Sequence, residues 1–155
     1  MPEQETLRRA RRDKRQGKAP TTQAGEFVRE EMHHIREGKH GARSTKQAIA
    51  IGLSKARRAG VKLSKPPASA KRSTKRSAAS ASGAGRRGRK PSRTRSRATS
   101  RALKREGRSA ASRPALSRQA RTAARRRSPS SRRQAARRAA RTRRHGTGRR
   151  RRASA

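Results

Sequence analysis

The charge of this chain limits what it can fold into more than any other feature of its sequence. Its 155 residues include 49 Lys and Arg but only eight Asp and Glu, which gives a formal net charge of +41. A compact state with this charge repels itself unless a polyanion neutralises it. The hydrophobic content is equally restrictive, because hydrophobic residues make up 26% of the chain and Phe27 is its one aromatic residue.

This combination predicts a chain that is mostly disordered. Low hydrophobicity with high net charge is typical of sequences that bury too little apolar surface to offset their conformational entropy. We therefore expect one small all-α unit, a helical hairpin, within an otherwise disordered chain. The charge is also unevenly placed: residues 1–37 hold nine basic and seven acidic residues, whereas residues 38–155 hold 40 basic residues and one acid, Glu106.

The composition shifts divide the chain into three expected segments. Residues 1–25 form a polar, basic N-terminal segment, residues 26–63 form the hairpin, and residues 64–155 form an Arg/Ala/Ser-rich basic arm. Within the first segment, residues 3–16 predict a short helix with acidic residues in its first turn and Gly17 at its end. Leu7 is its only large apolar residue, so we expect this helix to pack little and to fray.

Residues 26–63 carry the clearest helical signals. Residues 26–37 repeat apolar side chains at helical spacing, and Gly38 follows where a helix C-terminus often has a glycine. Ser44 is spaced from Gln47 as a capping box, and Gly60 fits a helix stop, so a second helix is predicted over about residues 45–59. An αα-hairpin follows from these two segments.

Ile51 lies off the apolar face of the second helix. A core of fewer than about 40 residues is usually insufficient without a staple or a partner. We therefore expect residues 26–63 to be a marginal monomer, to dimerise or contact a protein partner through Ile51, or to become ordered on binding.

The basic arm contains two stretches of latent helical character, residues 117–127 and residues 131–144. The second begins with Ser131 and Gln134 spaced as a capping box and places Ala and Arg on opposite sides. Repulsion between arginines four residues apart opposes both helices in the free chain. Because bound phosphates would remove that repulsion, we expect disorder in the free arm and helix formation on a nucleic acid.

Two glycine-rich motifs invite comparison with known phosphate-binding loops. Residues 83–88 match G-x-G-x-x-G, but no strand precedes them, so they predict a flexible linker rather than a dinucleotide site. Residues 38–41 lie between two helices, as the GXXG loop of KH domains does, although the KH sheet has no counterpart in this sequence. Small residues would let backbone amides of this loop approach a phosphate, and the sequence predicts such a contact with help from Lys39, Arg43 and Lys46.

Metal and catalytic chemistry are not expected. His33, His34 and His40, with Glu30 nearby, suggest metal ligands, but adjacent helical residues diverge by about 100°. We therefore predict surface histidines, no metal site and no cofactor. The chain contains no Cys, and no nucleophile has a core to orient it against a base, so we expect a non-enzymatic protein.

Nucleic acid is the partner that the composition predicts. Arg outnumbers Lys by 38 to 11, and its planar guanidinium suits phosphate contacts, although a GC-rich coding sequence would also favour Arg. The shortage of aromatic residues argues against stacking on single strands and favours duplex DNA. The predicted contacts are Lys39, Arg43, Lys46, Lys55, Arg57, Arg58, Arg125, Arg126, Arg127, Arg132, Arg133, Arg137, Arg138, Arg141, Arg144, Arg149, Arg150, Arg151 and Arg152.

The block EFVREEMHHIREGKHGARSTKQAIAIGLSKARRAGVKL, residues 26–63, resembles a family of small bacterial proteins of unknown function. The resemblance implies a bacterial origin and carries no assigned chemistry. The arm is similar in composition to the tails of linker-histone-like nucleoid proteins and of protamines. It differs from the Lys-Pro-Ala repeats of the former in being rich in Arg.

These observations predict a largely sequence-independent duplex DNA-binding protein of the cytoplasm, located on the bacterial nucleoid. No apolar run approaches the roughly 20 residues of a membrane span, so no membrane association is expected. An RNA-associated or ribosome-associated factor is one alternative, because a basic arm does not distinguish DNA from structured RNA. A second is an adaptor that binds a protein through residues 26–63 and is tethered to nucleic acid by its arm. A third is a C-terminal half that is a GC-rich translated frame under little constraint.

Overall fold

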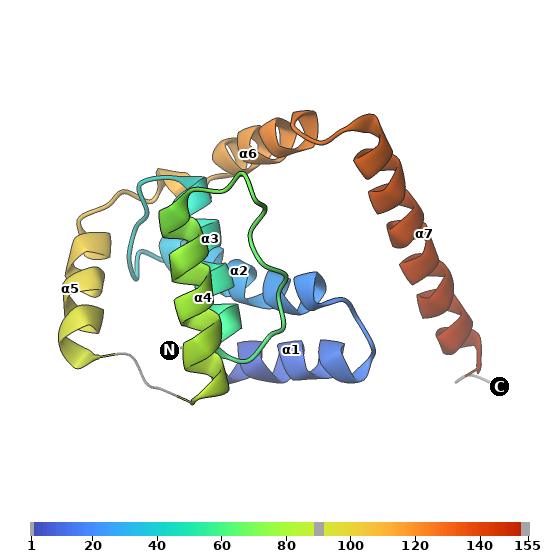
Figure 1. Cartoon of the computed structure of the whole chain (residues 1–155), viewed down its shortest axis with the longest axis horizontal. Helices are drawn as coiled ribbons and strands as arrows, with labels where there is room; N and C mark the ends of the chain where they lie inside the picture. Colours follow the sequence, from blue (N-terminus) through green and yellow to red (C-terminus); the bar gives the residue numbers. More distant parts are fainter. Residues whose placement is uncertain (1, 89–91, 153–155) are drawn as a thin grey trace. The chain divides into compact units, whose positions relative to one another are not determined.

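A computed structural model describes residues 2–88 and 92–152 of the chain, and for residues 138 and 142–152 it describes the backbone only (Figure 1). The chain divides into two compact units, Met1–Leu116 and Ser117–Ala155. The helices are α1 (Gln4–Arg15), α2 (Pro20–Arg36), α3 (Thr45–Arg58), α4 (Arg72–Arg86), α5 (Arg93–Lys104), the 3₁₀-helix η1 (Ser109–Ala111), α6 (Arg113–Arg125) and α7 (Pro129–Arg152).

The expectation of a mostly disordered chain is wrong. Helices cover most of the described residues, including much of residues 64–155, where a disordered arm was expected. Ala, Arg and Lys are among the strongest helix formers, so the arm satisfies its backbone hydrogen bonds locally. Low hydrophobicity limits the size of the core that such helices share, but it does not prevent the helices from forming.

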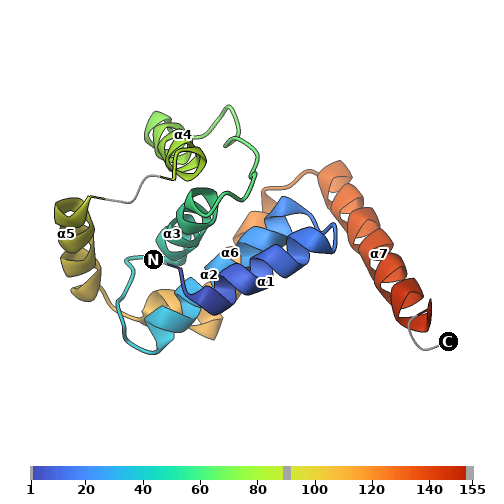
Figure 2. The same ribbon diagram turned by 90° about the horizontal axis from the view of Figure 1, so that it is seen from below.

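The predicted pairing of two helices within residues 26–63 is present as α2 and α3 (Figure 2). Helix α2 begins at Pro20, six residues before the expected start. Pro is favoured in the first turn of a helix. The expected start rested on the spacing of apolar residues, to which Pro20 adds nothing. The predicted cap of α3 at Ser44 is confirmed, but the return bond from Gln47 reaches Arg43, one residue before the cap. Ser44 Oγ accepts a hydrogen bond from the Gln47 N–H at 3.2 Å, and Gln47 Oε1 accepts one from the Arg43 N–H at 2.8 Å.

Glycines end these two helices as predicted. Gly38 and Gly60 adopt φ angles of 79° and 87°, a left-handed conformation that an L-residue with a Cβ rarely adopts. After α3, the Val61 N–H donates to the Ala56 carbonyl at 3.0 Å, which closes a Schellman motif. The chain therefore reverses direction sharply at each of these helix ends.

Helix α1 packs against α2, so the expectation that it has little to pack is wrong. Thr6, Ala10 and Asp13 are buried, and Leu7 contacts the core. The carboxylate of Asp13 accepts a hydrogen bond from Lys18 Nζ at 2.6 Å, which connects the end of α1 to the turn that leads into α2. Small and polar side chains thus make most of the contact, which the shortage of large apolar residues in this segment did not predict.

The core consists of two small clusters, one on each half of the α2–α3 pair. One contains Met32, Ile35, Ala42, Ala48, Ala110 and Ala111, and the other contains Ala10, Ala24, Phe27 and Ala56. The two helices approach each other closely at Gly52, where an added Cβ would lie 2.8 Å from the Cα of Val28. Alanine and glycine let backbones come close, so dispersion contacts between backbones replace part of the missing bulk.

Residues 83–88 are not a flexible linker. Gly83 and Gly85 lie in the last turns of α4, which packs on α3. A Cβ at Gly85 would overlap the carbonyl oxygen of Arg57, so the glycine is required by a close helix–helix contact. Helix packing, and not phosphate binding, therefore accounts for the glycine at position 85.

In the second unit, α6 covers residues 117–125 of the first stretch of latent helical character, and α7 covers the whole of the second. The expected capping box at Ser131 and Gln134 is wrong, because α7 begins at Pro129, two residues earlier. Ser128 Oγ accepts a hydrogen bond from the Ser131 N–H at 3.2 Å, and Pro at the first position has no N–H to satisfy. No helix in the described part of the chain is long and apolar enough to cross a membrane.

Candidate functional site

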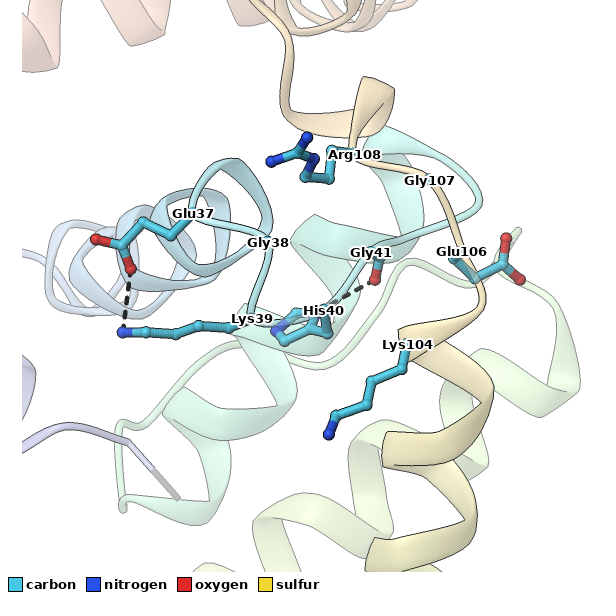
Figure 3. A pocket seen from close by; sticks show the side chains of 9 residues that line it. All are labelled: Glu37, Gly38, Lys39, His40, Gly41, Lys104, Glu106, Gly107 and Arg108. Carbon is cyan, nitrogen blue, oxygen red and sulfur yellow. Dashed lines mark hydrogen bonds and ion pairs between the residues drawn. The ribbon is translucent and has the colours of Figure 1, made fainter.

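The loop between α2 and α3 is held against the segment that follows α5 (Figure 3). The Gly41 N–H donates to the Leu103 carbonyl at 2.9 Å, and the Ala42 N–H donates to the Gly107 carbonyl at 3.1 Å. A Cβ at Gly41 would overlap the carbonyl oxygen of Glu106, so only glycine fits there. These amides are therefore not available to cradle a phosphate as the KH-like interpretation required.

A pocket of about 720 Å³ opens where the loop meets this segment. It is lined by residues 37–41, Lys104 and residues 106–108. The side chains of Lys104 and Arg108 lie on opposite sides of the loop in Figure 3, and both residues are solvent-exposed. No local pattern in the sequence points to these two cations, because only the packing of residues 103–108 on the loop brings them to it.

Lys39 lines the same pocket but is already paired. Its Nζ lies 3.1 Å from Glu37 Oε2 and 3.2 Å from Glu3 Oε1. The hydrogen bonds with Glu37 and Glu3 raise the pKa of Lys39, and the hydrogen bond from Lys39 lowers the pKa of Glu37. The pKa of Glu3 is lowered first by His34 and then by Lys39. A phosphate would have to compete with two carboxylates for this lysine.

Two of the predicted contacts on α3 are also occupied within the protein. Lys55 Nζ lies 2.7 Å from Glu31 Oε2 and 3.4 Å from Glu30 Oε1, both on α2. Arg57 is half-buried, and its Nη2 donates to the Ser64 carbonyl at 3.1 Å. The acidic residues of α2 thus draw Lys55 inward, which a helical projection of α3 alone does not show.

Three predicted cations of this region remain open to solvent: Arg43, Lys46 and Arg58. The side chain of Arg43 is 82% exposed, and its Nε lies 3.6 Å from Glu106 Oε1. A surface pair at this distance contributes little, so it does not prevent Arg43 from contacting a phosphate.

The predicted arginines at the C-terminal side of the chain lie in or next to α6 and α7. Those with described side chains are all exposed, namely Arg125, Arg126, Arg127, Arg132, Arg133, Arg137 and Arg141. Arg138, Arg144, Arg149, Arg150, Arg151 and Arg152 belong to α7, but their side chains lie outside the described ones. Arg133, Arg137 and Arg141 share one side of α7 through their i,i+4 spacing.

Ile51, the predicted dimer or partner contact, is half-buried. It lines a second pocket of about 710 Å³ together with Leu7 and Leu103. The isoleucine is therefore less exposed than its helical position predicts, because α1 and α5 contribute side chains around it. Its role in dimerisation stays a prediction.

The same pocket brings together Glu31, His34 and His40. The prediction of surface histidines is wrong for His34, which is 9% exposed, and for His40, which is half-buried. His33, by contrast, points outward with a side chain that is 66% exposed and pairs with Glu37 at 3.0 Å. The carboxylate of this group is Glu31 and not Glu30. The signal that could have found it is the i,i+3 spacing of Glu31 and His34, which places both on one helix face.

A family model described as "Family of unknown function (DUF6496)" matches residues 15–67 of the chain. The match covers α2, α3 and the loop between them and supports a relation to an uncharacterised family. It does not extend to Lys104, Arg108 or the second unit. No curated protein and no solved structure matches the chain.

Proposed function

We propose that the protein binds duplex DNA without sequence preference, by placing arginine side chains along the phosphate backbone. The observation that carries the proposal is the composition and exposure of the second unit. Residues 117–155 contain 16 arginines and no acidic residue, and every arginine of this unit whose side chain is described is exposed. A surface of this kind has no internal counter-charge and attracts a polyanion.

None of the acidic residues belongs to the second unit, because all eight lie in the first unit, where each is paired with a cation. Each of the eight carboxylates lies within 4.0 Å of a Lys, Arg or His in the described part of the chain. These pairs involve six Lys and Arg residues, which are Arg9, Lys18, Arg29, Lys39, Arg43 and Lys55. The remaining charge supports contact with a large polyanion rather than with a small anionic ligand.

Helix α7 offers a regular row of cations for this purpose. Arg133, Arg137 and Arg141 recur every four residues, which is about 6 Å along a helix axis. Guanidinium groups bind phosphate through two parallel hydrogen bonds. Because phosphates between the arginines would relieve their mutual repulsion, DNA binding and the stability of α7 favour each other.

Affinity as a function of salt tests the proposal directly. The full-length protein is titrated with a fluorescent duplex of random sequence at several salt concentrations, and binding is followed by fluorescence anisotropy. If about 15 phosphates are contacted, log affinity falls against log salt with a slope near −13. A slope shallower than about −4 would contradict contact along the backbone.

Matched variants locate the contact. The full-length triple variant R133Q/R137Q/R141Q removes three charges from α7, and R93Q/R97Q/R101Q removes three exposed charges with the same spacing from α5. We expect the α7 variant to make the slope shallower by about 3, since each phosphate contact contributes about 0.9, and the α5 variant to change it less. Equal effects would show that total charge, and not the α7 row, determines binding.

Competition between nucleic acids separates the alternatives. Duplex RNA presents the same phosphate charge in a different geometry, so unlabelled DNA and RNA duplexes of equal length are compared at one salt concentration. Stronger competition by DNA supports the proposal. Stronger competition by RNA would favour an RNA-associated or ribosome-associated factor instead.

A further inference from the structure

Three side chains with metal-binding chemistry meet beside the α2–α3 pair. Glu31 and His34 lie one helical turn apart on α2, and His40 comes from the loop that follows it. Each offers a ligand atom, and these atoms lie within 4.8 Å of one another. Glu31 is 0% exposed and His34 is 9% exposed, so the group is not a chance cluster on the surface.

The hydrogen bonds of His40 leave one ring nitrogen facing the carboxylate. Its Nδ1 lies 3.1 Å from the Gly41 carbonyl oxygen, which only accepts, so Nδ1 carries the hydrogen (Figure 3). Nε2 of the neutral ring then has a lone pair, and it lies 3.3 Å from Glu31 Oε1. Two acceptors at this distance repel each other unless a cation, either a proton or a metal ion, lies between them.

His34 is oriented in a comparable way. Its Nε2 lies 2.7 Å from Glu3 Oε1, and because the carboxylate accepts, Nε2 is the donor and the lone pair of the neutral ring is on Nδ1. Metal-binding histidines commonly donate their other ring N–H to a carboxylate or a backbone carbonyl, which fixes the tautomer. Glu3 supplies the carboxylate to His34 and Gly41 supplies the carbonyl to His40.

The carboxylate of Glu31 is the second, independent sign of a ligand. Both of its oxygens are buried, but they differ in what they face. Oε2 is neutralised by Lys55 Nζ at 2.7 Å, whereas Oε1 has no hydrogen-bond partner in the described part of the chain. A buried carboxylate oxygen without a partner is costly, and a cation bound at Oε1 removes that cost while Lys55 stays at Oε2.

We propose that Glu31, His34 and His40 bind a Zn²⁺ ion. Two imidazoles and one carboxylate are a ligand set that zinc uses in proteins, with water in the fourth position, whereas Mg²⁺ and Ca²⁺ prefer oxygen ligands alone. The three residues line the pocket of about 710 Å³, which gives an ion and its water a path to the site. The ion would connect the loop to α2 and so fix the position of residues 38–43.

Nuclear magnetic resonance of the imidazole nitrogens tests the site in the unaltered full-length protein. ZnCl₂ is added to ¹⁵N-histidine-labelled protein without nucleic acid, so the result does not depend on DNA binding. We expect one Zn²⁺ per chain, with large ¹⁵N shifts for His34 and His40 and none for the exposed His33. Unchanged imidazole signals for His34 and His40 on addition of Zn²⁺ would overturn the proposal.

Matched variants test the same site by affinity. His34→Gln and His40→Gln each remove one ligand, and His33→Gln changes the neighbouring histidine that faces solvent. Calorimetry should show Zn²⁺ affinity at least about tenfold weaker for the first two and unchanged for the third. Equal weakening by His33→Gln would contradict the site, as would equal affinity for Mg²⁺. Helical circular dichroism of each variant shows that it is folded, and the ¹⁵N experiment remains decisive if one is not.

Discussion

At the scale of single residues, the first unit handles its few acidic groups by pairing each with a nearby cation. Glu37 shows the pattern at the mouth of the loop. Its Oε2 lies 3.1 Å from Lys39 Nζ, and its Oε1 lies 3.0 Å from His33 Nε2. The hydrogen bond from Lys39 is the main cause that lowers the pKa of Glu37 below its usual 4.5. This carboxylate therefore favours the folded state only while it is ionised.

The variant Glu37→Gln should change how the free energy of unfolding depends on pH in the acidic range. A carboxyl group whose pKa is lower in the folded state stabilises fully above its unfolded pKa, and that stabilisation is lost as pH falls through the folded pKa. Urea denaturation of the wild type and of Glu37→Gln should therefore differ at pH 7 and converge below pH 4.5. The difference is small because the side chain is 40% exposed. Curves that stay parallel from pH 7 to pH 3 would contradict this role of Glu37.

At the scale of elements, the helix ends could be predicted from local signals in the sequence, whereas the long-range contacts could not. The helix cap at Ser44 and the glycine at position 60 are local signals, and both are present as predicted. Gly41 and Gly85, however, are required by backbones 65 and 28 positions away, at Glu106 and Arg57. No window of sequence contains both partners of such a contact, so both glycines were interpreted as loop or linker residues.

The candidate site shows the same division. The i,i+3 spacing of Glu31 and His34 is visible in the sequence, but the approach of His40 and Lys55 depends on how the loop and α3 fold back onto α2. A projection of one helix places Lys55 among the solvent-facing cations. The pairing of α2 with α3 turns it toward Glu31, because a buried carboxylate needs an opposite charge.

The junction between the α2–α3 loop and the segment after α5 predicts an unequal effect of two glycine substitutions. Gly41→Ala forces the loop away from the Glu106 carbonyl and should lower the free energy of unfolding by about 1–3 kcal/mol, as overpacking does. Gly107→Ala is the control on the other side of the junction, since nothing lies within 4 Å of its added Cβ. It should change stability by no more than about 0.5 kcal/mol. Denaturation with urea measures both, and equal losses would show that the close contact at Gly41 is not what the junction requires.

At the scale of the whole molecule, disorder was predicted because the chain contains few large hydrophobic residues. The chain instead combines strong helix formers with two clusters built largely from alanine around Phe27, Met32 and Ile35. Such clusters bury little area per residue, so the margin of stability over self-repulsion is narrow. Repulsion among the net +41 charges therefore opposes a folded state that has little stability to spare.

Screening of that charge should stabilise the protein, although salt weakens its surface ion pairs. The Debye length falls from about 30 Å at 0.01 M salt to about 8 Å at 0.15 M. Repulsion among a net +41 charges acts over these longer distances, whereas the exposed pairs of Arg9 and Lys39 act at contact and contribute little. The melting temperature of the full chain, followed by circular dichroism, should therefore rise between these two salt concentrations. A fall over the same range would mean that the ion pairs of the first unit, rather than the net charge, govern its stability.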